Sequence, residues 1–182
     1  MIPEFYTRDE SGIPTVWVKR MRESMARLTP RFSDNRTVRE YTTQHYLPAA
    51  AAYRERAANK GAVGRNIVNW EHTLKEKWAT LHFGEVKVET RGEQHVFEVQ
   101  VCLNDLDPKA VRVELYADGI MGSAPVQQEM KRVRQHAGAS GGYVYSAVVS
   151  AARPPADYTA RVIPHCAGVA VPLEANAILW QR

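Results

Sequence analysis

The side chains that could carry out catalysis are present in this chain of 182 residues, but they lack the spacing that catalytic sites require. Asp105 and Asp107 are spaced like a pair of acid–base carboxylates, yet they lie in Asn104-Asp105-Leu106-Asp107-Pro108, a composition typical of a turn. Ser140 and Ser146 have no histidine and no acid where a hydrolytic triad would need them. We therefore assign no catalytic residue to the chain.

Phosphate-binding and metal-binding motifs are also missing from the sequence. Gly138, Gly141 and Gly142 come closest to a glycine-rich phosphate loop, but no helix is expected after them, which favours a hairpin turn. The six histidines show no ligand spacing with each other or with the two cysteines, Cys102 and Cys166. Two cysteines favour free thiols in a reducing compartment. We assign no cofactor-binding residue and no metal ligand.

The residues up to about position 81 have a helical period. The first apolar stripe consists of Trp17, Met21, Met25 and Leu28, and the last of Val63, Ile67, Trp70, Leu74 and Trp78. Pro30 ends the first helix, and Ser33 is suited to cap the next one, with Arg36 where a complete capping box would have Glu or Gln. Pro48 suits a first helical turn, and the alanine-rich run after it should be helical until Gly61.

From Phe83 the period changes to two, so the boundary is expected near Leu81–Gly84. The expected strands are Glu85–Thr90, His95–Leu103, Val111–Ala117, Pro125–Val133, Tyr143–Ser150, Tyr158–Pro164 and Ala177–Gln181. The fold class is therefore α+β, with a helical segment at 1–81 and a seven-stranded antiparallel immunoglobulin-like β-sandwich at 83–182. Asp157-Tyr158 resembles a tyrosine corner, which would make Tyr158 architectural.

Charge is distributed unevenly along the chain. Residues 1–60 contain 11 Lys/Arg and 7 Asp/Glu, whereas residues 61–182 contain 13 of each. A nucleic-acid-binding function would depend on Lys19, Arg20, Arg22, Arg27, Arg31, Arg36 and Arg39. Interleaved acids and the lack of an aromatic platform favour a solvated helix surface instead. No apolar run is long enough for a membrane span, and the start has no signal-peptide features, so we expect a cytoplasmic fragment that begins within an element.

An ordered set of residues near the N-terminus resembles a known family. The set consists of Trp17, Met21, Ser24, Arg31-Phe32-Ser33, Arg36 and Glu40-Tyr41. It is similar to the closing helices of the α-glucan (glycogen and maltodextrin) phosphorylases, and Ile2-Pro3 through Gly12-Ile13-Pro14 fits the stretch that leads into them. The rest of the chain is similar to the C-terminal extension of the longer bacterial members. The resemblance covers nearly all of the chain, but only the tail of a much larger enzyme.

The resemblance implies a parent enzyme that uses pyridoxal phosphate to phosphorolyse α-1,4-glucan to glucose 1-phosphate. The lysine that binds the cofactor in that family lies in a Gly- and Ser-rich motif that this sequence lacks, so no cofactor is expected in this chain and it should be inactive alone. Trp17, Phe32, Arg36 and Tyr41 would anchor the closing helices to the remainder of the catalytic body, which is the implied partner. We expect a structural or assembly role, without nucleic acid or membrane as a partner.

A glucan-binding β-sandwich module is the alternative function. Tyr116 and Trp180 are candidates for stacking on a sugar ring, because aromatic faces pair well with sugars. Tyr143 and Tyr145 are also candidates, but they share a strand face with apolar residues and fit the core equally well. Tyr116 shares its face with charged residues, which makes it the better candidate. A basic helical nucleic-acid binder ranks last.

Overall fold

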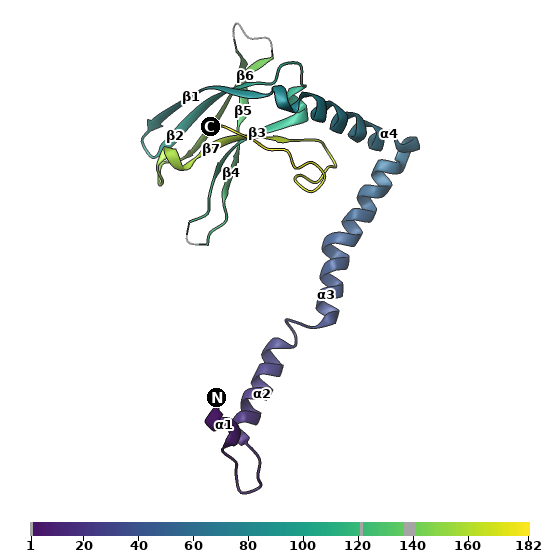
Figure 1. Cartoon of the computed structure of the whole chain (residues 1–182), viewed down its shortest axis with the longest axis vertical. Coiled ribbons are helices and arrows are strands. Elements are labelled where there is room, and N and C mark those ends of the chain that lie inside the picture. The colour runs from purple at the N-terminus through teal and green to yellow at the C-terminus, as the bar shows by residue number, and fades with distance from the viewer. Residues whose placement is uncertain (1, 121, 137–140) are drawn as a thin grey trace. The chain divides into compact units, whose positions relative to one another are not determined.

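The computed structural model describes residues 2–120, 122–136 and 141–182, so Gly138 and Ser140 lie outside the described residues. The chain divides into two compact units, Met1–Ala58 and Asn59–Arg182. Figure 1 labels the α-helices and the strands β1 to β7. The first unit is helical, and the second begins with helix and continues as strands, so the fold is α+β as expected.

The helices of the first unit have no core of their own. They are α1 (Ile2–Tyr6), α2 (Thr15–Leu28), α3 (Asp34–Tyr41), a π-helical turn at Thr42–Tyr46 and the beginning of α4 (Leu47–Lys77). None of residues 2–58 is buried. Helices in water gain most of their stability from packing of an apolar face, and these helices have little such packing within their own unit.

Local hydrogen bonds explain where α3 begins and how it continues. Ser33 is the N-cap, and its Oγ accepts a hydrogen bond from the Arg36 backbone N–H at 3.4 Å, as the sequence predicts. In the π-helical turn, Thr43 Oγ1 donates to the Arg39 carbonyl oxygen at 2.8 Å. Pro48 is the second residue of α4, but α3, the π-helical turn and α4 follow one another without a break, so Pro48 lies within a continuous helix and the prediction of a first helical turn there is wrong. The π-helical turn just before it is the local departure from α-helix that a proline in a helix interior requires.

The backbone of α4 enters the left-handed region at three consecutive residues, Asn59, Lys60 and Gly61, with φ of 52°, 58° and 76°. Glycine adopts this conformation freely and asparagine tolerates it, but for Lys60 it costs about 1–2 kcal/mol. These residues lie where the sequence predicts the alanine-rich helix to end. They begin the second compact unit.

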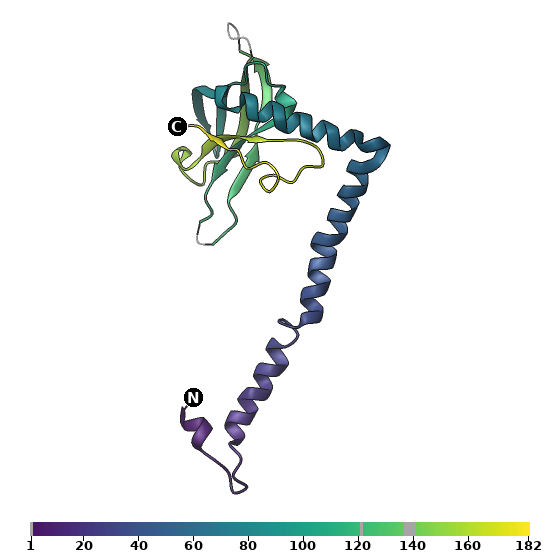
Figure 2. The same ribbon diagram turned by 45° about the vertical axis from the view of Figure 1, so that its right-hand side comes forward.

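The second unit contains two four-stranded sheets in which every paired strand is antiparallel. The first sheet has the order β1 (His82–Arg91), β2 (Gln94–Cys102), β6 (Gly142–Ser150), β5 (Lys131–Gln135). The second has the order β4 (Val126–Glu129), β3 (Val111–Ala117), β7 (Thr159–Pro164), β8 (Leu179–Trp180). Figure 2 shows the same strands turned by 45°.

The prediction of seven strands is wrong, because the described residues form eight. The single strand expected at Pro125–Val133 is two strands, β4 and β5, which belong to different sheets. Met130 lies between them, is 3% exposed, and its N–H donates to the Val113 carbonyl oxygen at 2.8 Å. The apolar residues here are sparse, since Val126 and Met130 have one parity and Val133 has the other, so periodicity alone does not locate the change of sheet.

The core of the second unit combines the inward faces of both sheets with the last turns of α4. The most deeply buried side chains are Val99, Val101 and Leu103 from the first sheet and Val113, Leu115 and Val162 from the second. Leu74 of α4 is 5% exposed, and Trp70 Nε1 donates to the Ala110 carbonyl oxygen at 3.1 Å. Helix changes to strand at His82, inside the expected boundary, whereas the compact units divide after Ala58.

We expect Lys60→Gly to raise the free energy of unfolding by about 1 kcal/mol, because glycine removes the left-handed strain at this position. If Lys60 were in a continuous right-handed helix, Lys60→Gly would instead lower the free energy of unfolding by about 1 kcal/mol. The sign of the change therefore distinguishes the two backbone conformations. Urea unfolding measures the difference. Asn66→Gly, at an exposed right-handed position of the same helix, is the matched control and should lower stability.

Candidate functional site

The outer surface of the second sheet carries a group of aromatic and charged side chains. We call Glu114, Tyr116, Arg161 and Trp180 the aromatic–arginine cluster. Glu114 pairs with Arg161 across β3 and β7, and Arg161 pairs with Trp180 across β7 and β8. Side chains opposite one another in an antiparallel pair lie on the same face, so the register brings the cluster together. Val113 and Leu115 occupy the opposite, core-facing side of β3.

An ion-pair network with a buried carboxylate forms the base of the cluster. Arg161 Nε and Nη2 donate to Glu114 Oε2 at 3.0 Å and 2.8 Å. Arg112 Nε lies 2.7 Å from the other carboxylate oxygen, Oε1. The Glu114 residue is only 3% exposed. A buried carboxylate is tolerated when its charge is paired and hydrogen-bonded, and here two guanidinium groups meet that requirement.

The two predicted stacking residues lie side by side above this network. The ring centroids of Tyr116 and Trp180 are 5.4 Å apart, with an interplanar angle of 75°. The guanidinium carbon of Arg161 lies 4.6 Å from the Tyr116 centroid and 5.4 Å from the Trp180 centroid, which are cation–π distances. The Tyr116 hydroxyl donates to Asp118 Oδ1 at 2.9 Å, and this hydrogen bond raises the pKa of Tyr116.

The other two tyrosine candidates belong to the core side of the first sheet. Tyr145 is 6% exposed, and burial raises the pKa of its hydroxyl to about 12. Tyr143 is half-buried, and the Arg132 guanidinium carbon lies 5.3 Å from its ring centroid. The alternative that these residues fit the core is confirmed. Sequence reasoning did not identify Arg161, because its role depends on the pairing of β3 with β7.

Two of the four expected anchors, Trp17 and Phe32, lie on or next to α2, and they differ in their contacts. The Trp17 ring is perpendicular to the Phe5 ring, with centroids 5.6 Å apart, and an ion pair of 2.8 Å between Arg20 and Glu4 also joins α1 to α2. Phe32 is 73% exposed. Trp17 therefore has a local partner, whereas the Phe32 side chain is available to another surface.

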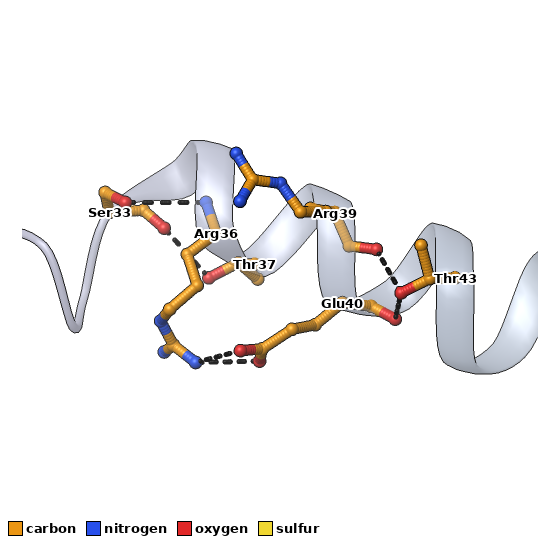
Figure 3. Close-up of polar contacts among 6 residues, drawn as sticks. All are labelled: Ser33, Arg36, Thr37, Arg39, Glu40 and Thr43. Atoms are coloured by element: carbon orange, nitrogen blue, oxygen red, sulfur yellow. Dashed lines mark hydrogen bonds and ion pairs between the residues drawn. The ribbon is translucent and has the colours of Figure 1, made fainter.

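The other two anchors lie on α3. Figure 3 shows that Arg36 reaches along the helix to Glu40, with Nη1 at 2.6 Å and 2.7 Å from the two carboxylate oxygens. Tyr41 is 53% exposed and stacks on Tyr46 with centroids 6.4 Å apart. Arg36 and Tyr41 thus contact near neighbours in sequence, Trp17 contacts Phe5 of α1, and Phe32 is exposed. Their role as attachment points stays a prediction.

The lysines of this chain do not fit a pyridoxal phosphate site. Lys77 is the least exposed of those with an ion pair, and its Nζ lies 2.6 Å from Asp105 Oδ2. The remaining lysines are exposed: Lys19, Lys60, Lys75, Lys87, Lys109 and Lys131. A lysine that binds a cofactor needs an enclosed site to set its position and pKa. Lys75 lines an open pocket with Leu74 and Trp78, but its side chain is 74% exposed.

The paired carboxylates in the turn have structural partners. The hydrogen bond from Lys77 holds the pKa of the Asp105 carboxyl below its usual value. Asp107 Oδ1 accepts the Lys109 backbone N–H at 2.9 Å and caps a short 3₁₀ helix at Pro108–Ala110. Among the described residues, no group of three His, Cys, Asp or Glu side chains could hold a metal ion. Neither Cys102 nor Cys166 forms a disulfide within the described part of the chain.

In the described part of the chain, no helix is both long enough and apolar enough to cross a membrane.

Comparison with known proteins gives consistent matches. Residues 78–182 match the family described as glycogen phosphorylase C-terminal domain. Glycogen phosphorylase from Mycobacterium tuberculosis is 30% identical over 182 residues, covering 89% of this chain and 20% of that protein. Maltodextrin phosphorylase from Thermococcus litoralis is 28% identical over 155 residues, covering 82% of this chain and 18% of that protein. The chain therefore spans about a fifth of the length of these curated relatives.

We expect Glu114→Gln to lower the free energy of unfolding by about 1–3 kcal/mol, because it removes the charge that compensates two guanidinium groups. Glu129→Gln is the matched control, since Glu129 is the exposed neighbour of Glu114 on β4 and should change stability by less than about 0.5 kcal/mol. Urea denaturation of both variants measures the difference. Equal effects would contradict a stabilising role for the buried network.

Proposed function

We propose the function of this chain from its family: it belongs to the glycogen phosphorylase C-terminal domain family. The chain is the C-terminal portion of an α-glucan phosphorylase, with helices that complete the catalytic body and an appended β-sandwich. Its own role is structural or in assembly. The parent reaction is phosphorolysis of α-1,4-glucan to glucose 1-phosphate in the cytoplasm, and pyridoxal phosphate and the catalytic groups belong to the rest of the enzyme.

Exposure of apolar side chains in the first unit carries this proposal. Phe32 is 73% exposed, Met25 65%, Val38 63% and Leu28 48%. An amphipathic helix whose apolar face is exposed requires a partner surface. Because the chain spans about a fifth of its relatives, the remainder of the phosphorylase is the partner that we assign to this surface.

Two observations support an immunoglobulin-like assignment for the sandwich at 83–182. The order β1-β2-β6-β5 corresponds to the A-B-E-D sheet of that fold, and β3-β7-β8 corresponds to C-F-G, with β4 beside β3. Tyr158 precedes β7, is 8% exposed, and its hydroxyl donates to the Ser150 carbonyl oxygen at 3.1 Å. This is the hydrogen bond of a tyrosine corner. Of the helical segment at 1–81, we assign the part before Asn59 to the catalytic body, because Leu74 and Leu81 lie in the core of the sandwich.

Glucan binding at the aromatic–arginine cluster is the second candidate function. The observation that favours glucan binding is that Tyr116 and Trp180 lie next to each other. They are 64 residues apart in the sequence, yet their ring centroids are 5.4 Å apart. Arg161 is 12% exposed and covers one side of each ring. Sugar rings stack on aromatic faces, and Asp118 and Arg112 provide polar groups for hydroxyls.

We expect Phe32→Ala to weaken binding of this chain to a phosphorylase body that lacks its C-terminal fifth by about tenfold or more, as for other aromatic anchors. Tyr53→Ala is the matched control, because Tyr53 is also 73% exposed in the same unit but is not an expected anchor. Calorimetric titration measures both affinities.

Hydrogen exchange on the isolated chain provides the second readout. Amides of α2 and α3 should exchange with little protection, and those of β2, β3, β6 and β7 should exchange slowly. Equal protection of both units in the isolated chain, or equal affinities of the two variants, would contradict the proposal.

For the second candidate function, we expect maltooligosaccharides to bind the chain weakly and Tyr116→Ala to reduce the affinity by about tenfold, the usual scale for loss of an aromatic anchor. Tyr116→Phe keeps the ring, loses the bond to Asp118 and should retain binding. NMR titration at millimolar sugar measures these affinities. Loss of binding in Tyr53→Ala, or no binding at all, would exclude the cluster as a glucan site.

A further inference from the structure

The edge strand β1 offers a long unpaired backbone to other molecules. It has 10 residues, His82–Arg91, and lies at one end of the order β1-β2-β6-β5. Most of its residues are exposed. Its side away from β2 has no partner strand among the described residues. An edge of this kind is a template for pairing with another strand unless its side chains prevent it.

Four charged side chains of alternating sign lie on the outer face of this strand. Lys87 pairs with Glu98 and Val88 pairs with buried Phe97, which places Lys87 outward and Val88 toward the core side. Ion pairs of 3.4 Å between Lys87 and Glu85 and of 2.6 Å between Arg91 and Glu89 join the outward set. The outward order is therefore Glu85, Lys87, Glu89, Arg91.

This order is complementary to itself in one antiparallel register. When two copies of β1 pair around a two-fold axis at Val88, Lys87 faces Glu89 of the second copy. Glu85 lies at the register shift between Phe83 and Val86, so it is the nearest acidic residue to Arg91 of the second copy without a fixed register. Both pairs of Lys87 with Glu89 then combine opposite charges, which stabilises an antiparallel pair. Val88 faces its own copy on the other side of the sheet, where it is 40% exposed.

The neighbouring registers are excluded by the same charges. An axis at Lys87 places Lys87 opposite itself, and an axis at Glu89 places Glu89 opposite itself and Lys87 opposite Arg91. Like charges directly opposite destabilise strand pairs. The charge order therefore selects one register as well as permitting pairing.

The other sheet edges are unsuited to the same contact. At the opposite edge of the first sheet, β5 carries Lys131, Arg132 and Arg134, so a second copy would place cations opposite cations. The edges of the second sheet, β4 and β8, have only 4 and 2 residues. Short strands and single-sign charge are usual protections against edge pairing.

We propose that β1 pairs antiparallel with β1 of a second copy of this chain, around a two-fold axis at Val88. The pairing joins two first sheets into one continuous sheet. A contact of one strand pair buries less than the roughly 1,200–2,000 Å² of a stable interface, so the association is weak and salt-dependent. The inference concerns this chain alone and does not depend on the proposed function.

Charge exchange at two positions tests the register. Sedimentation equilibrium of the full chain at low salt should give a dissociation constant that Lys87→Glu raises by about tenfold, because two attractive pairs become repulsive. Glu89→Lys should have the same effect. The double variant Lys87→Glu/Glu89→Lys restores opposite pairs and should associate like the unchanged chain.

Mixing the two single variants should also restore association, since Lys87→Glu and Glu89→Lys complement each other across the axis. Equal association of all four proteins would overturn the proposal and would assign self-association to other surfaces, such as the exposed helices.

Cross-linking provides the geometric control. Val88→Cys should form a symmetric disulfide-linked dimer under mild oxidation, because paired Cα atoms across an antiparallel ladder are about 4.5–5.5 Å apart. Val133→Cys is the matched control, because Val133 lies on β5 and is 55% exposed. Its disulfide-linked dimer should not exceed the background that Cys102 and Cys166 give in the unchanged chain. Equal cross-linking of the two variants would overturn the proposal.

Discussion

The arrangement of the second unit depends on the burial of apolar side chains between two sheets. Val99 and Val101 on one sheet and Val113 and Leu115 on the other are almost completely buried. Because successive side chains of a strand point to opposite faces, this inward set determines which residues point outward. The outward position of Glu114 and the orientation of its partner Arg161 both follow from that constraint. The set of buried side chains therefore determines which residues are available for function on the outer face of either sheet.

The first unit shows the opposite situation. Its helices have well-formed local interactions, including the Ser33 cap and the Arg36–Glu40 ion pair, but none of its described residues is buried. Surface ion pairs and caps each contribute on the order of 1 kcal/mol or less, which is small beside the conformational entropy of ordering a helix. Local signals can thus specify where a helix begins without stabilising it.

Sequence reasoning was sufficient where the relevant interaction is local. The change of period near His82, the cap at Ser33 and the turn around Asp107 are all encoded within a few residues. It failed where the interaction is long-range. The change of sheet at Met130 and the pairing of Glu114 with Arg161 depend on which strands become neighbours, and a repeating pattern of two contains no information about that choice.

The last turns of α4 have a consequence for how this sandwich can be transferred between proteins. Leu74 is 5% exposed and Leu81 4% exposed, both within the same apolar core as the strands. A gene segment cut at the first strand would therefore leave a hole in that core and would remove the hydrogen bond from Trp70 to the Ala110 carbonyl, which would keep only the bond from the His165 N–H. Recombination during evolution would have to carry the helix with the strands. The segment that recombination could transfer as one folded unit therefore begins near Gly61.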